Sequence, residues 1–70
     1  MRNRLKHWRH RKEMDQTEFA EYLGVRPGQI NQWEHHKKQP SLETLWAIYQ
    51  KLKADFPELH MEDLIDPVED

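Results

Sequence analysis

The 70-residue sequence contains no cysteine, only two glycines and no long apolar run. Without cysteine, neither a disulfide nor a thiolate metal site can stabilise the fold. No apolar segment approaches the roughly 20 residues of a membrane-spanning helix, and the N-terminus lacks the apolar segment of a signal peptide. These absences predict a cytoplasmic protein with no membrane partner.

Hydrophobic residues are also scarce. They make up 36% of the chain, and the mean hydropathy is −1.16. A chain of this length allows one domain with a small core, so we expect marginal stability that self-association would increase. We place the domain at residues 1–66 and an acidic C-terminal tail at residues 67–70.

The chain also lacks the residue spacings of catalytic and metal sites. No spacing supplies a nucleophile with its base, a phosphate-binding glycine loop or a metal triad, so we expect neither an enzyme nor a cofactor. Two histidine pairs, His7 with His10 and His35 with His36, lack carboxylate or thiolate ligands arranged around them. We therefore predict no metal site.

Charged residues are unevenly distributed along the chain. The formal net charge of −2 is unusual for a protein that binds nucleic acid. However, residues 1–39 contain nine Lys or Arg against five Asp or Glu, whereas residues 40–70 contain two against eight. Such a chain can turn a positive face to phosphates and a negative face away from them. The alternative is that both halves carry ordinary solvated charges.

Apolar side chains between residues 16 and 34 have the spacing of two short helices. Residues three or four apart share a helix face. The two pairs that do so are Phe19 with Leu23, and Ile30 with Trp33. Gly24 lies between the pairs and can adopt the positive φ that ends the first of these helices. The stretch therefore predicts a helix-turn-helix.

Capping residues indicate where the helices begin. Asp15 and Glu18 have the spacing of a capping box, which makes Gln16 the first residue of its helix. Pro27 suits the first position of the next helix, which we predict over residues 27–35. Ser41 is a good N-cap for the helix that follows.

The remaining apolar residues are assigned to the core. We predict a first helix over residues 3–13, and a short fifth helix from Met61 to Ile65 that ends before Pro67. The inward positions in these flanking segments are Leu5, Trp8, Leu42, Leu45, Ile48, Leu52, Phe56, Leu59 and Leu64.

Trp46 and Tyr49 lie at the edge of the apolar stripe of the fourth helix. A domain this small cannot easily bury all of its large aromatic side chains. We therefore treat these two residues as a candidate dimer contact. Partial burial at the rim of the monomer core is the alternative.

The sequence resembles the Cro and phage-repressor type of helix-turn-helix, the Xre family. The pattern that carries the resemblance is Gln16, Ala20, Gly24-Val25, Ile30, Trp33-Glu34 and Pro40-Ser41. The resemblance extends from about residue 5 to residue 64. It implies an all-α, compact five-helix lambda-repressor-like domain that binds double-stranded DNA, with the third helix in the major groove.

With its apolar side turned inward, the third helix has an opposite face that is rich in amides and without acids. Gln and Asn can bond the edge of adenine, and Arg can do the same for guanine. The resemblance favours Arg26 and Gln32 as base readers. The full set of candidate base-reading residues is Arg26, Pro27, Gly28, Asn31 and Gln32. An ordinary solvated face is the alternative.

Other residues around this helix are candidates for contacts with phosphates. In the resembling family a Gln at the position of Gln16 bonds a phosphate, helped by the positive end of its helix. Lysines that follow a recognition helix are well placed to neutralise phosphates. The candidate phosphate-binding residues are Gln16, Gln29, His35, Lys37 and Lys38.

The resemblance also implies an ion pair between the first and third helices. The family has an Arg at the position of Arg9 that pairs with a Glu at the position of Glu34. A charge-assisted bond between them would hold the two helices together; two exposed charges that never meet are the alternative. The chain departs from the family at Arg26, which is a poor N-cap, and at His36, where Gly is usual.

These observations predict a small transcriptional regulator, more often a repressor than an activator. It would bind a two-fold-symmetric operator as a homodimer. One alternative is an antitoxin that uses Trp46, Tyr49 and the acidic end against a toxin. The other is a protein-interaction module that has lost DNA binding, which the pI of about 6.2 favours.

Overall fold

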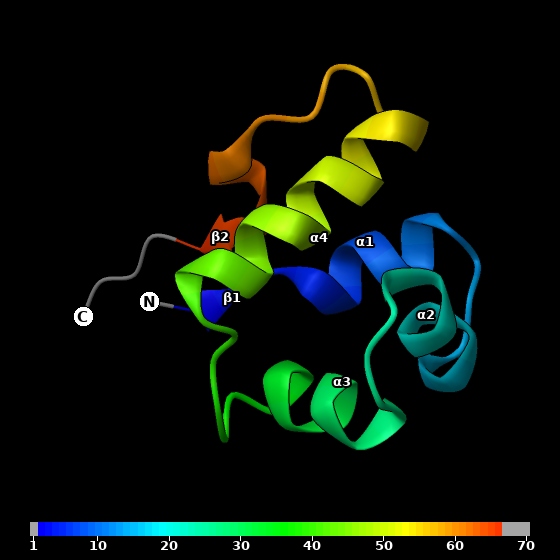
Figure 1. Cartoon of the computed structure of the whole chain (residues 1–70), viewed down its shortest axis with the longest axis vertical. Helices are drawn as coiled ribbons and strands as arrows, with labels where there is room; N and C mark the ends of the chain where they lie inside the picture. Colours follow the sequence, from blue (N-terminus) through cyan, green and yellow to red (C-terminus); the bar gives the residue numbers. More distant parts are fainter. Residues whose placement is uncertain (1, 67–70) are drawn as a thin grey trace.

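The computed structural model describes residues 2–66, so the acidic tail predicted at residues 67–70 lies outside the described residues. Within them the protein is mostly helical (Figure 1). The elements are β1 (Arg2–Asn3), α1 (Leu5–Arg11), α2 (Gln16–Leu23), α3 (Pro27–Glu34), α4 (Leu42–Asp55), the 3-10 helix η1 (Met61–Leu64) and β2 (Ile65–Asp66).

The five-helix prediction is corrected at both ends of the domain. The expected fifth helix is the single 3-10 turn η1, and Ile65 belongs to β2. β2 pairs antiparallel with β1, which brings Arg2 opposite Asp66. The first helix begins at Leu5 instead of residue 3, because Asn3 lies in β1. Two-residue strands are too short to leave an alternating pattern in a sequence.

Asn3 is a buried polar residue whose importance the sequence did not indicate. Its Nδ2 donates to the carbonyl oxygen of Trp33 and to Oε1 of Gln39, both at 2.9 Å. Its Oδ1 accepts from the backbone N–H of Leu5 at 3.2 Å. These bonds satisfy the buried amide and fasten the N-terminal strand to the end of α3.

The helix-turn-helix is formed by α2 and α3, and its turn chemistry is as expected. Asp15 and Glu18 form the capping box at the start of α2, with bonds of 2.8 Å and 2.9 Å. Gly24 ends α2 in the left-handed conformation, with φ of +75°. The next N–H, of Val25, bonds the carbonyl oxygen of Ala20 at 2.9 Å, which closes the turn.

The core lies where the four α-helices and η1 meet, and it contains most of the residues assigned to it. The buried apolar residues are Leu5, Trp8, Phe19, Ala20, Leu23, Ile30, Trp33, Leu45, Ile48, Leu52, Leu59 and Leu64. Phe56 packs against this core and is partly buried.

Leu42 is an error in the predicted core, because its side chain is 77% exposed. A helix turns by about 100° per residue, so Leu42 and Ile48 are rotated to opposite sides of Leu45. The core covers the side of Ile48 and Leu52, which leaves Leu42 on the same flank as the half-exposed Trp46.

Candidate nucleic-acid interface

Figure 1 shows α3 at one edge of the molecule. Ile30 and Trp33 are buried, as the apolar spacing predicted. The residues of α3 on the face opposite the core are exposed to solvent, apart from the half-buried Gln32. The exposed residues are Arg26, Pro27, Gly28, Gln29 and Asn31. All five predicted base-reading residues therefore belong to one surface of one helix or to its N-cap.

This face carries no negative side chain within residues 26–33. The acid that follows, Glu34, has a side chain only 2% exposed and turned into the protein. The cationic Arg26 and the neutral amides are thus the polar groups that α3 offers to a ligand. Such a set is compatible with the negative potential of a DNA groove.

The N-terminus of α3 is capped in an unusual way. The guanidinium of Arg26 has donors alone, so it cannot accept from the first N–H groups of the helix. Instead Oε1 of Gln29 accepts from the backbone N–H of Arg26 at 3.1 Å. This bond leaves the amide nitrogen of Gln29 unused, and Arg26 and Gln29 are both exposed.

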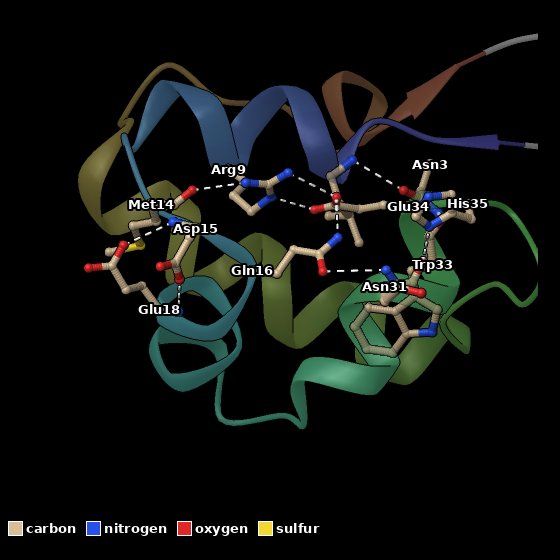
Figure 2. Close-up of polar contacts among 11 residues, drawn as sticks. Asn3, Arg9, Met14, Asp15, Gln16, Glu18, Asn31, Trp33, Glu34 and His35 are labelled. Atoms are coloured by element: carbon tan, nitrogen blue, oxygen red, sulfur yellow. Dashed lines mark hydrogen bonds and ion pairs between the residues drawn. The ribbon is translucent and has the colours of Figure 1, made fainter.

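Arg9 and Glu34 are brought together as a bidentate ion pair (Figure 2). Nε of Arg9 lies 2.7 Å from Oε2 of Glu34, and Nη2 lies 3.1 Å from Oε1. The remaining guanidinium nitrogen, Nη1, donates to the carbonyl oxygen of Met14 at 3.0 Å. Since the Arg9 side chain is only 11% exposed, this pair fastens α1, the α1–α2 turn and the end of α3 together.

Gln16 lies half-buried at the junction of α2 and α3. Its Nε2 donates to Oε1 of Glu34 at 3.0 Å, and its Oε1 accepts from Nδ2 of Asn31 at 3.4 Å (Figure 2). The residue that the resemblance assigns to a phosphate thus also belongs to a polar network within the protein.

The C-terminal end of α3 carries the basic candidates. Nδ1 of His35 lies 2.9 Å from the carbonyl oxygen of Asn31; because a carbonyl oxygen can accept but not donate, Nδ1 carries the proton. His36 has φ of +59°, a left-handed conformation that favours Gly. Lys37 and Lys38 follow on the surface.

A second polar cluster, on the other side of α2, was not predicted. Nζ of Lys12 lies 2.7 Å from Oδ2 of Asp55, and the hydroxyl of Tyr22 donates to the same oxygen at 2.6 Å. Hydrogen bonds from Lys12 and Tyr22 lower the pKa of the Asp55 carboxyl, and burial raises the pKa of the Tyr22 phenol. The cluster joins the end of α1, α2 and the end of α4, and it thereby holds the first helix of the helix-turn-helix against α1 and α4.

The described residues 2–66 hold no group of three metal-ligating side chains. None of their helices has the length and apolar character required to cross a membrane. A surface pocket of about 410 Å³ lies between α1, the end of α4 and η1, where Trp8, Arg11 and Phe56 line it.

Comparison with known proteins agrees with this geometry. Residues 5–59 match a family model described as Helix-turn-helix. No curated protein and no solved structure matches the chain. Domains of this family bind DNA in regulation and are typically not enzymes. The chain therefore belongs to the Cro- and Xre-like helix-turn-helix family of sequence-specific DNA-binding regulators.

Proposed function

We propose that the protein is a small transcriptional repressor that inserts α3 into the major groove of double-stranded DNA and lays α2 across the backbone. The observation that supports this most is the exposed, amide-rich and acid-free face of α3 above the buried Ile30 and Trp33. A cytoplasmic location stays a prediction from the sequence.

Base readout is assigned to the exposed face of α3. The guanidinium of Arg26 suits guanine, and the amides of Asn31 and Gln32 suit adenine. Pro27 is assigned to a thymine methyl. Apart from its chain neighbours and the backbone of its own helix, Gly28 has no described atom within 4 Å of the position that a Cβ would occupy. Packing within the protein therefore does not require glycine at this position. A close approach of the helix backbone to the bases would require it.

Phosphate contacts are assigned to the residues around that face. Lys37 and Lys38 follow α3 on the surface, and Gln29 offers the amide nitrogen that its cap bond leaves unused. His35 can donate to a phosphate only through Nε2 of a doubly protonated ring, because its Nδ1–H is occupied by the carbonyl of Asn31. Gln16 lies at the N-terminal end of α2, where the helix dipole favours an anion.

We propose a homodimer on a two-fold-symmetric operator. A single domain with one short recognition helix makes few base contacts, and half-sites of such operators lie about 34 Å apart. The largest extent of this domain is 32 Å, so two copies fit side by side at that spacing. The proposed dimer contact is the exposed flank of α4, formed by the exposed Leu42 and Trp46 with the partly buried Tyr49 beside them.

Duplexes selected from a random pool, followed by shift assays with two variants, test this assignment. Gln32→Ala should lose about 1–3 kcal/mol of discrimination at one base pair. Lys38→Ala should weaken all duplexes alike and reduce the salt slope by about 1. If both variants keep full affinity for the selected sequence, α3 is not the recognition helix.

An antitoxin with the same DNA-binding face is the second candidate. The exposed Leu42 and Trp46 side chains favour it, because they also suit contact with a different protein. A chain that stays monomeric at high concentration but binds a small toxin through Trp46 would support it. A protein that binds no duplex at low salt would instead be an interaction module.

A further inference from the structure

Four polar side chains from three helices form one continuous chain of hydrogen bonds that ends at the recognition face (Figure 2). It begins with the guanidinium of Arg9 on α1, which holds both oxygens of Glu34. Glu34 accepts from Gln16 of α2, and Gln16 accepts from Asn31 of α3.

The chemistry of these groups fixes the direction of every bond in the chain. A carboxylate paired with a guanidinium can only accept, so the atom of Gln16 that faces Glu34 must be the amide nitrogen. The amide oxygen of Gln16 then points the other way, toward Asn31. Because that oxygen also accepts only, Asn31 must turn its own nitrogen toward Gln16.

We infer that Gln16 is a positioning residue that holds the Asn31 amide in one of its two orientations, and so sets the base that Asn31 reads. One N–H of Asn31 is committed to Gln16. Its Oδ1 and its second N–H are left for the edge of a base, since Asn31 is exposed. This inference rests on the proposed DNA-binding function of α3.

The fixed orientation predicts which base Asn31 prefers. In the major groove adenine offers an amino group beside an acceptor, which matches the oxygen and the second N–H of Asn31. Cytosine offers the amino group alone, and guanine offers two acceptors that would confront the oxygen. Asn31 should therefore favour adenine, accept cytosine and reject guanine.

Selection of duplexes by the wild-type protein and by Asn31→Ala identifies the base pair that Asn31 reads. At that pair the wild type should prefer adenine over guanine by about tenfold. In Gln16→Ala the Asn31 amide can rotate by half a turn and donate to guanine, so the ratio should approach one there and stay unchanged at other pairs. Gln50→Ala, the same change at an exposed position of α4, should keep the wild-type ratio.

The outcomes separate positioning from a phosphate contact. If Gln16→Ala weakens adenine and guanine duplexes equally and keeps their ratio, Gln16 acts on the backbone alone and the inference is wrong. A wild-type preference for guanine at the pair would overturn it as well.

A second measurement tests the hydrogen bond between Gln16 and Asn31 without DNA. The side-chain amide resonances of Asn31 in the free protein should shift in Gln16→Ala and not in Gln50→Ala, while the melting temperatures show that both variants fold. Unchanged Asn31 resonances would show that Gln16 does not hold the Asn31 amide, even if the protein binds DNA. If no duplex is bound but the resonances shift, the bond exists, the proposed function is wrong, and the base-reading role fails with it.

Discussion

At the scale of single residues, Glu34 links stability to the proposed recognition of bases, because the same carboxylate accepts hydrogen bonds from Arg9 and from Gln16. Glu34→Ala would leave the nearly buried guanidinium of Arg9 without its partner. Removal of one member of a buried pair costs about 3–5 kcal/mol, so we expect a large fall in the urea midpoint. Glu21→Ala, which removes an exposed acid from α2, is the control. Similar unfolding curves for the two variants would contradict the structural role of the pair.

The two histidines after α3 should respond in opposite ways to glycine. His36 has φ of +59°, whereas His35 has φ of −91°. His36→Gly removes a left-handed strain of about 1 kcal/mol, and a gain of this size raises the melting temperature of a small domain by about 4–8 °C. His35→Gly should lower it, because glycine removes the ring that bonds the carbonyl of Asn31 and adds chain entropy to the unfolded state. Calorimetry of both variants measures the contrast.

Some single-residue contacts could be predicted and others could not. Arg9 and Glu34 were identified because the resemblance carries both positions. Asn3 could not be assigned, since its partner Trp33 lies 30 residues away along the chain and a lone polar residue has no periodicity. The contact of Tyr22 with Asp55 could not be predicted either, because these two residues are 33 positions apart in the sequence.

At the scale of elements, local chemistry predicted the helix-turn-helix well. The capping box of Asp15, the turn at Gly24 and the start of α3 at Pro27 are all signalled by neighbouring residues. The ends of the domain were predicted less well, because β1 and β2 depend on each other across the whole chain. Leu42 was misassigned because spacing shows which residues share a helix face but not how far the core extends over it.

Within α3, Gly28 offers a test that separates stability from binding. Gly28→Ala should stabilise the helix by about 0.5–1 kcal/mol, since the added methyl group meets no described atom beyond its chain neighbours and its own helix backbone. The same methyl group should obstruct close contact with bases and lower affinity for the selected duplex. We therefore expect the melting temperature to rise while the affinity in a shift assay falls.

Gly24→Ala is the contrasting variant for that experiment. Its φ of +75° is unfavourable for alanine, so this change should lower stability. A Gly28→Ala protein that binds DNA as tightly as the wild type would show that α3 does not approach the bases at this position.

At the scale of the whole molecule, the exposed flank of α4 should control assembly. Trp46→Ala removes a half-exposed side chain, so the monomer should keep its stability while the dimer weakens. Affinity for a two-half-site operator should then fall by much more than affinity for a single half-site. Analytical ultracentrifugation and shift assays on both duplexes measure this, with Gln50→Ala as the exposed control. Equal losses on the two duplexes would argue against a dimer contact at Trp46.

Acid should destabilise the whole fold in two stages. Burial and the nearby Arg4 and Arg11 lower the pKa of His7 below its usual 6.5. The unfolded chain therefore takes up this proton first, and stability falls as the pH drops from 6.5 toward the lowered value. The pKa of Asp55 is also lowered, so its contribution is lost below pH 3.8.

Urea midpoints measured against pH test the first stage. His7→Gln cannot titrate, so its stability should change less just below pH 6.5 than that of the wild type. Parallel curves for the two proteins in this range would show that His7 has the same pKa in the folded and unfolded chains.

The pairing of β1 with β2 affects the order in which contacts form while the chain is being translated. Some contacts of the first residues need the last described ones, because the N–H of Arg4 bonds the carbonyl of Leu64 and Nε1 of Trp8 bonds that of Asp63. A nascent chain that has released α1, α2 and α3 from the ribosome still lacks these partners. The bonds of Asn3 to Trp33 and Gln39 can form earlier, but β1, which carries Asn3, gains its strand partner only when translation reaches β2.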